Sequence, residues 1–305
     1  MTLVLSVATP AYALHVSDRL VSAGGKPFDP LANKTVVFRA TDGLLAIGYT
    51  GIAFLDGLPT DTWIADELSG GAASTAGGFM ALGHFQIRDL GFSLLRLCQK
   101  LRHKQFQDFG GEVVAVGWQW QQRRRYSRPR DVLWVLHSGS GALRWDQLVP
   151  RSIEAQRQVF RMVFTGDWPL GNEEWKRLLT QVGQAGPDWE SVEALLVAAI
   201  RASSEVRPGT IGGNCMSVLA RPVGYPQALI RFSPITPRFG SAFDQQVELA
   251  YSPWLIAPDA ILSPSVSVGG MSTEQGLLTF SMDFPSPPQG QRLKGALQSQ
   301  KRPEN

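Results

Sequence analysis

The N-terminal segment, residues 2–48, constrains the fold of this chain more than any other part of the sequence. Apolar and polar residues alternate with a period of two in residues 3–8, which predicts a strand, and a Thr-Pro turn follows it. A second short strand is predicted at residues 12–16. A β-branched run at residues 34–38, a Thr-Asp-Gly turn and a return run at residues 44–49 predict a hairpin. The segment therefore predicts two hairpins in one sheet.

Four residues of this segment have the chemistry of an N-terminal nucleophile. Thr2 becomes the first residue if Met1 is removed, and its own α-amine can then act as the base that a threonine hydroxyl needs. A charged Lys34 beside that amine would lower the pKa of the amine, and Asp18 would hold the lysine in place. The backbone N–H of Gly48 could stabilise an oxyanion. We expect the strand ends to bring these parts of an acyl-transfer site together.

The same four residues resemble the catalytic threonine, aspartate, lysine and oxyanion glycine of the proteasome-type β-subunit family, which includes simple bacterial homologues. The sequences Ser-Asp-Arg at 17–19, Asn-Lys-Thr-Val-Val-Phe at 33–38 and Ala-Ile-Gly at 46–48 carry the resemblance, which extends more loosely over residues 2–221. It implies an α+β fold, the four-layer αββα sandwich of two antiparallel sheets that is typical of Ntn hydrolases. It also implies a threonine peptidase that cleaves peptide or other amide bonds.

The resemblance also implies a substrate pocket and partners. By gapless matching the pocket is apolar, and the expected substrate is a peptide or unfolded protein with an apolar side chain before the cleaved bond. The implied pocket residues are Val21, Ala32, Val36, Ala46, Thr50 and Phe54. Thr165 and Gly166 are weaker candidates for the site wall. A ring-like homo-oligomer is implied as well, with room for an ATPase partner that nothing in the chain identifies.

Several positions depart from the family pattern. Leu20 stands where the family has an arginine, Ile211 replaces a serine before a glycine pair, and a supporting aspartate falls near Pro208. The groups that orient the α-amine are therefore altered. Two alternatives to a peptidase stay open: a catalytically inactive structural subunit of a proteasome-like assembly, and an amide hydrolase for small molecules.

The composition is that of an ordinary globular protein, with 305 residues, 44% apolar and 18% charged, and a net charge of +3. Cys98 and Cys215 are far apart in the sequence and indicate neither a disulfide framework nor a metal motif. The histidines have no ligand spacing, so neither a metal nor a cofactor is expected. Apolar runs are too short to span a membrane and no secretory signal is recognised, so we expect a cytoplasmic protein.

The chain is expected to form one large domain with an extension. We assign residues 2–221 to the Ntn-hydrolase domain, residues 222–284 to a C-terminal extension with short strands, and residues 285–305 to a disordered tail. Apolar residues at helical spacing predict a helix at residues 84–107, and Asp188 is the expected N-cap of another helix.

An arginine-rich segment at residues 119–130 lies between two predicted strands. Five arginines with aromatic neighbours could bind nucleic acid. No other nucleic-acid motif supports that function, so a solvated hairpin tip or a subunit contact is the favoured interpretation.

Overall fold

The computed structural model describes residues 2–23, 26–29, 32–75, 80–104, 106–123, 126–139, 142–148, 151–153, 158–222, 227–233, 253–264, 271–272 and 279–283. Over these residues the chain is a mixed α+β protein with two large sheets, which confirms the predicted fold class at that level. The helices and their bounds are α1 (Thr60–Ser69), α2 (Ala72–Thr75), α3 (Leu90–His103), α4 (Gly171–Ala185) and α5 (Trp189–Val206), with a 3-10 turn at Phe106–Phe109.

The first sheet contains the N-terminal strand β1, which pairs in antiparallel fashion with β14 on one side and β2 on the other. The two predicted hairpins therefore lie in different sheets and not in one, because β1 and β2 belong to this sheet whereas β5 and β6 belong to the other. Its eight strands, in order across the sheet, are β13 (Arg151–Ile153), β14 (Gln158–Gly166), β1 (Leu3–Ala8), β2 (Ala13–Asp18), β15 (Cys215–Arg221), β16 (Gln227–Ser233), β20 (Thr279–Asp283) and β19 (Met271–Ser272).

The second sheet contains the hairpin that begins after Lys34. Its eight strands, in order, are β12 (Ala142–Gln147), β11 (Tyr126–Gly139), β10 (Glu112–Arg123), β6 (Gly43–Thr50), β5 (Thr35–Ala40), β17 (Trp254–Ile256), β18 (Ala260–Leu262) and β9 (Met80–Leu82). The expectation of two purely antiparallel sheets is wrong at two places, because β17 runs parallel to β5 and β20 runs parallel to β16. Two small hairpins, β3 (Val21–Ala23) with β4 (Lys26–Asp29) and β7 (Phe54–Leu55) with β8 (Leu58–Pro59), complete the strands.

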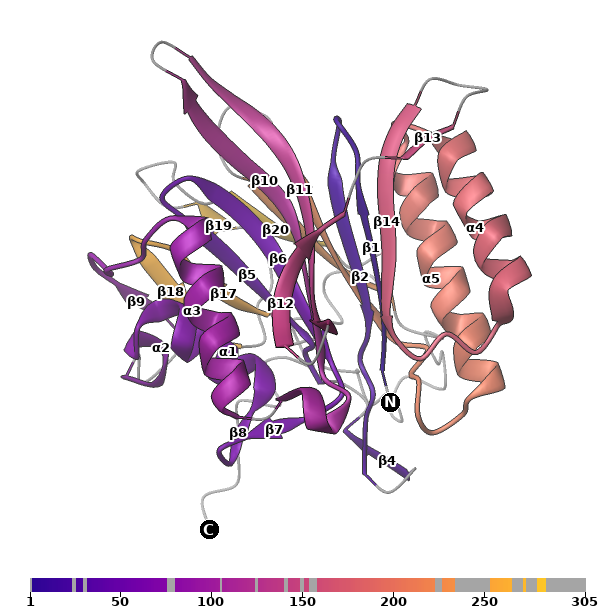
Figure 1. The fold of residues 1–305 in the computed structure, drawn as a ribbon, viewed down its shortest axis with the longest axis horizontal. Helices are drawn as coiled ribbons and strands as arrows, with labels where there is room; N and C mark the ends of the chain where they lie inside the picture. The colour runs from indigo at the N-terminus through magenta and orange to yellow at the C-terminus, as the bar shows by residue number, and fades with distance from the viewer. Residues whose placement is uncertain are drawn as a thin grey trace, which may run out of the picture.

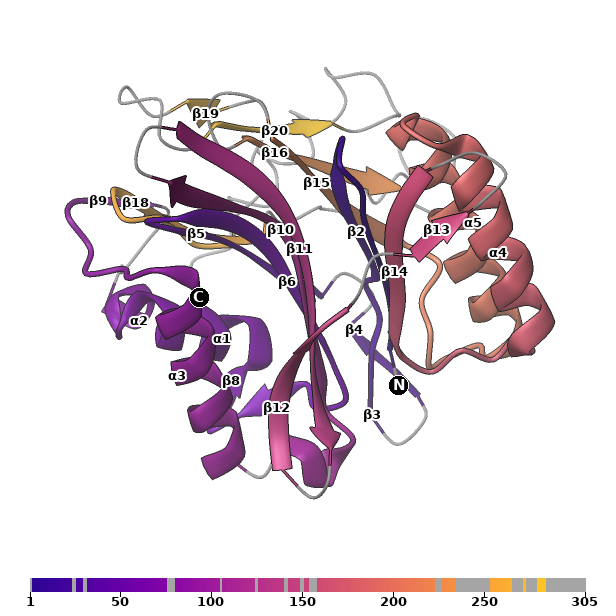
Figure 2. The same cartoon turned by 45° about the horizontal axis from the view of Figure 1, so that its top comes forward.

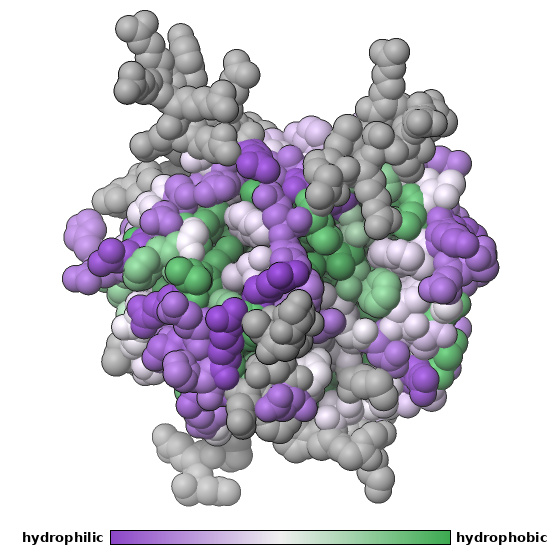
Figure 3. Space-filling model, in the orientation of Figure 1, coloured by the Kyte–Doolittle hydropathy of each residue, from purple (hydrophilic) through white to green (hydrophobic). Residues whose placement is uncertain are grey.

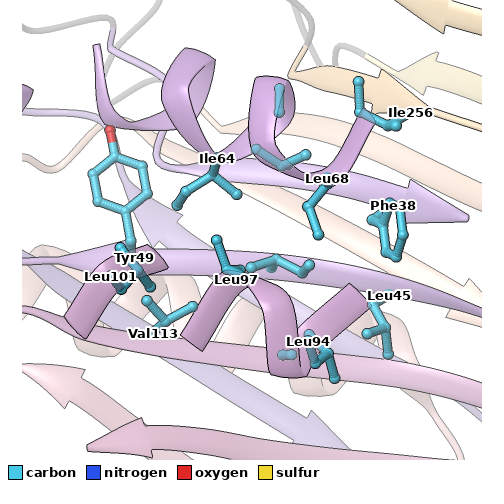
Figure 4. Packing of buried hydrophobic residues seen from close by; sticks show 14 of the residues in the cluster. Phe38, Leu45, Tyr49, Ile64, Leu68, Leu94, Leu97, Leu101, Val113 and Ile256 are labelled. Atoms are coloured by element: carbon cyan, nitrogen blue, oxygen red, sulfur yellow. The ribbon is translucent and has the colours of Figure 1, made fainter. Parts of the chain in front are cut away.

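Three apolar clusters hold these elements together. One lies between the sheets, where Val218 of the first sheet and Val116 of the second belong to the same cluster. A second lies between the second sheet and the helices α1 and α3, where Ile64 and Leu97 pack against strand residues (Figure 4). The third joins α4 and α5 to the first sheet through residues such as Leu196. Figures 1 and 2 show the two helix pairs on opposite outer sides of the sheets.

Helix boundaries follow the capping residues. The expected cap Asp188 begins α5, where its carboxylate accepts a hydrogen bond from Ser191 N at 3.3 Å, so this prediction is confirmed. The helix predicted from residue 84 begins only at Leu90, because Asp89 caps it by accepting from Phe92 N at 2.9 Å.

Segments from beyond residue 221 are built into both sheets. β16 and β20 extend the first sheet, and β17 and β18 extend the second. The predicted boundary between a domain and an extension stays a prediction, and the predicted disordered tail at residues 285–305 lies outside the described residues.

The surface in the orientation of Figure 1 combines both kinds of residue. Figure 3 shows hydrophobic residues on either side of a hydrophilic band that runs down the middle of this face. Within the described part of the chain, none of the helices combines the length and the apolar character that a membrane crossing needs.

Candidate functional site

Thr2 lies just before β1, at the end of the molecule where the N-terminus is marked in Figure 1. The residue is buried, with 8% of its surface exposed. Its carbonyl oxygen accepts a hydrogen bond from Asp167 N at 3.0 Å, directly after β14. β14 therefore fixes the backbone of Thr2 and leaves its hydroxyl for other partners.

Lys34 joins the predicted nucleophile to the predicted aspartate. Its ammonium nitrogen Nζ lies 2.9 Å from Thr2 Oγ1 and 3.0 Å from both carboxylate oxygens of Asp18. It also donates to the carbonyl oxygen of Leu20. Lys34 is 2% exposed and Asp18 is fully buried, so little solvent screens this ion pair. Residues from three separate strand ends thus meet around one nitrogen atom.

Backbone amides from three segments fix the carboxylate of Asp18. Oδ1 accepts from Leu3 N at 3.0 Å, and Oδ2 accepts from Leu20 N at 3.2 Å and from Gly212 N at 2.9 Å. A side chain at Gly212 would not fit, because its Cβ would lie 2.6 Å from Cβ of Leu20. These hydrogen bonds fix the orientation of the carboxylate and so determine where Lys34 can bind.

Burial lowers the pKa of Lys34 below its usual value, and the adjacent Asp18 opposes that shift. A lysine with a lowered pKa releases a proton more easily than one in water. In its charged form, Lys34 donates to Thr2 Oγ1 and would stabilise negative charge that develops on that oxygen.

The structure does not present the N–H of Gly48 to Thr2. Tyr49 N donates to Lys34 O at 3.2 Å, toward β5. Successive residues of a strand direct their N–H and C=O groups to alternate sides, so the Gly48 N–H points to β10, where Val114 is its register partner. The Gly48 N–H, which the sequence suggested as a donor to an oxyanion, is thus directed to the neighbouring strand β10.

Gly48 instead makes room for a buried histidine. A Cβ at Gly48 would lie 2.2 Å from Cε1 of His15. The His15 ring is fully buried between the sheets, with Nδ1 3.0 Å from Ser6 Oγ and Nε2 3.0 Å from Thr35 Oγ1. Since Thr35 follows Lys34 directly, this polar chain ties the first sheet to the strand that carries the lysine.

We expect the free energy of unfolding to fall as the pH drops below about 6.5. Burial lowers the pKa of His15 to about 3, so between these values the unfolded chain binds a proton that the folded chain excludes. The contribution is fully present above pH 6.5, and its loss approaches about 1.4 kcal/mol per pH unit on the way to pH 3. Urea unfolding at pH 7 and pH 5 measures it.

His15→Gln provides the matched comparison for this prediction, because it removes the titrating ring and keeps an amide that can hydrogen-bond. Its stability is expected to depend less steeply on pH than that of the unchanged protein. Burial raises the pKa of Asp61 to about 6, so this group makes the folded protein more stable as the pH falls. The effect of Asp61 is the same in the variant and in the unchanged protein, so it cancels when their pH slopes are compared. Equal slopes would contradict a buried neutral His15.

The weaker candidates Thr165 and Gly166 lie at the end of β14, beside Thr2. Gly166 has φ of +89°, and a Cβ there would lie 1.9 Å from Thr2 O. Thr165 is 1% exposed and pairs with Val4 in the first sheet. Both residues are therefore close to the predicted nucleophile.

The six residues implied for a substrate pocket do not line one wall. Val36 belongs to the cluster on the helix side of the second sheet, whereas Ala46 belongs to the cluster between the sheets. Thr50 is 1% exposed, and Phe54 is 47% exposed in the small β7–β8 hairpin. Val21 and Ala32 are half-buried. The pocket stays a prediction.

One neighbour of the site was missed in the sequence. Glu112, at the start of β10, accepts a hydrogen bond from Gly166 N at 2.9 Å. The only local signal is a charged residue directly before a β-branched run, and a sequence pattern cannot place that run beside β14.

Comparisons with known proteins give a distant structural similarity. No family model and no curated protein matches the chain. The Anbu (Gly-1) mutant from Hyphomicrobium sp. strain MC1 is 12% identical, with 72% of this chain and 82% of that chain covered and a TM-score of 0.45. Anbu (ancestral beta-subunit) from Yersinia bercovieri is 11% identical, with coverage of 73% and 81% and a TM-score of 0.45.

These findings correct one prediction from the sequence. Assignment to the proteasome-type β-subunit family is wrong, because no family model matches and the structures found to be similar are Anbu proteins, a related but distinct family. At this level of identity and superposition, the similarity carries no argument about activity.

Proposed function

We propose that this protein is an N-terminal threonine hydrolase that cleaves amide bonds, with peptides as the expected substrates. The observation that carries the proposal is the buried Lys34 Nζ, which lies between Thr2 Oγ1 and the carboxylate of Asp18. A structural ion pair needs no third partner, whereas here the lysine is hydrogen-bonded to a hydroxyl that can act as a nucleophile.

The reaction requires that the Met1–Thr2 bond be cleaved first. Thr2 Oγ1 then attacks the carbonyl carbon of the substrate, and its proton passes to the freed α-amine of Thr2. Lys34 stabilises the oxygen, and Asp18 holds Lys34. The substrate C–N bond breaks, the leaving amine takes the proton, and an ester on Thr2 remains. Water hydrolyses that ester and regenerates the hydroxyl.

The proposal includes the fold type. The apolar cluster between the sheets and the helix pairs outside them support a four-layer αββα sandwich of the Ntn-hydrolase type. The ring-like homo-oligomer, the ATPase partner and the cytoplasmic location stay predictions from the sequence.

The N-terminal peptide mass tests the proposed function. Protein expressed with its natural N-terminus is incubated with an apolar peptide epoxyketone, a probe that reacts with a hydroxyl and an adjacent amine together. We expect a terminal Thr2 that carries the adduct, in the unchanged protein and in Thr2→Ser. Thr2→Val is expected to carry none. A retained Met1, or a processed chain that never forms the adduct, would overturn the proposal.

A non-catalytic structural subunit is the second candidate. The observation that favours it is the Gly48 amide, which the β6–β10 ladder occupies and which therefore offers no free oxyanion donor. This candidate predicts a chain that forms no adduct with or without Met1, and that assembles normally when Thr2 is replaced by valine. Adduct formation on Thr2 would exclude it.

A further inference from the structure

Two buried hydroxyl groups beside Thr2 lack hydrogen-bond partners. Within the described part of the chain, Oγ1 of Thr50 and Oγ1 of Thr165 are among the few enclosed side-chain oxygens without one, and each residue is 1% exposed. Buried polar groups are nearly always paired, so an orphaned pair next to a site indicates a ligand group that is still to arrive.

Gly166 places both hydroxyl-bearing residues close to Thr2. The Cβ position of Gly166 is 3.1 Å from Cγ2 of Thr50 and 1.9 Å from the carbonyl oxygen of Thr2. Thr165 precedes Gly166 and pairs with Val4, and side chains two residues apart share a strand face, so Thr165 and Thr2 face the same side. Residues from both sheets thus lie close to Thr2.

Glu112 adds a negative charge beside these residues. It pairs with Thr50 across the β6–β10 ladder, so the two side chains lie on the same face of the second sheet. Its Oε2 accepts from Gly166 N at 2.9 Å and so reaches across to the first sheet. A carboxylate keeps acceptor capacity after one such bond, because it has about four lone-pair sites.

We propose that Glu112, Thr50 and Thr165 bind the α-ammonium group of Thr2 that forms when the Met1–Thr2 bond is cleaved. The inference rests on the proposed function, in which the α-amine of Thr2 is the base, and it names the residues that hold that amine. An ammonium group has three donors and no acceptor, which matches two hydroxyl oxygens and a carboxylate. Glu112 is then a positioning residue that orients the amine and raises its proton affinity.

Several charged groups surround the amine. Lys34, before β5, lowers its pKa, whereas the carboxylates on the other elements raise it. These carboxylates are Asp18 on β2, Glu112 on β10 and Asp167 after β14, the last of which faces Arg207 Nε at 3.7 Å. Replacement of Glu112 removes one negative charge and leaves the contacts between Lys34, Thr2 and Asp18 in place.

The test measures the rate of adduct formation with the peptide epoxyketone at pH values between 5 and 9. The adduct is detected by the mass of the N-terminal peptide. Glu112→Gln is expected to move the midpoint of the acid limb down by about 0.5–1 pH unit and to lower the plateau rate by about tenfold. The matched control is Glu174→Gln on α4, where the exposed carboxylate pairs with Arg177. It is expected to change neither value.

A second pair of variants keeps the inference testable if Glu112→Gln folds poorly. Thr165→Val removes the hydroxyl at nearly constant volume and is expected to lower the plateau rate about fivefold or more, whereas Thr165→Ser retains the hydroxyl and the rate. An unchanged midpoint in Glu112→Gln, or equal rates for the valine and serine variants, would overturn the inference. The absence of any adduct on the unchanged, processed protein would instead overturn the proposed function.

Discussion

Lys34→Met is expected to abolish adduct formation on Thr2, with a rate loss of at least about 100-fold, because it removes the charge that stabilises the attacking oxygen. The variant keeps an unbranched apolar stem in a site that is 2% exposed. It also leaves Asp18 buried without its counter-ion, which is expected to lower the free energy of unfolding by about 3 kcal/mol or more. Adduct mass and urea unfolding measure the two effects separately.

The double variant Lys34→Met with Asp18→Asn separates stability from activity. With both charges removed, no unpaired carboxylate is buried. The free energy of unfolding is therefore expected to recover in part, while the adduct stays absent. Lys100→Met on α3 is the control, because that side chain is 49% exposed and pairs with Glu67 on α1. Normal adduct formation in Lys34→Met would rule out a role for the lysine in activating Thr2.

Gly166→Ala is expected to lower the free energy of unfolding by about 3 kcal/mol or more and to prevent adduct formation. Positive φ costs an alanine about 1–2 kcal/mol, and forcing a methyl group into a filled space costs about 1–3 kcal/mol more. The added Cβ would lie 1.9 Å from the carbonyl oxygen of Thr2, a backbone atom that cannot move without disturbing β1. Urea unfolding and adduct mass provide the measurements.

Gly171→Ala separates the two contributions. Gly171 also has positive φ, at +83°, but a Cβ there meets nothing within 4 Å. Gly171→Ala is expected to lower the free energy of unfolding only by the backbone strain, and to leave adduct formation unchanged. If the two variants lose equal stability, the contact with Thr2 contributes nothing, and close packing of Gly166 against the nucleophile is not what requires glycine at that position.

The sequence was sufficient to place three of the four proposed catalytic residues. Strand alternation locates β1, β2, β5 and β6, and residues at strand ends converge when their strands lie in facing sheets. Thr2, Asp18 and Lys34 are such residues, and the structure brings their side chains within hydrogen-bond distance. Local rules succeed here because each residue directly adjoins a strand with a clear period.

Gly48 shows where such rules fail. The direction of a backbone N–H depends on which neighbouring strand a residue bonds to, and that is set by the pairing of β6 with β10. Matching without gaps also assigns pocket positions to Val36 and Ala46, whose side chains belong to apolar clusters on opposite faces of the second sheet. Partners distant in the sequence decide both features, as they do for Glu112 and Gly166.

Because β17 pairs with β5, the strand that follows Lys34 acquires its second neighbour late in translation. Trp254 pairs with Val36, two residues after Lys34, so β5 has its full set of neighbours only after the chain has grown past residue 256. Until then β5 is an open edge strand, although Thr2, Asp18 and Lys34 have long left the ribosome. A nascent chain therefore carries Thr2, Asp18 and Lys34 well before β5 gains its second neighbouring strand.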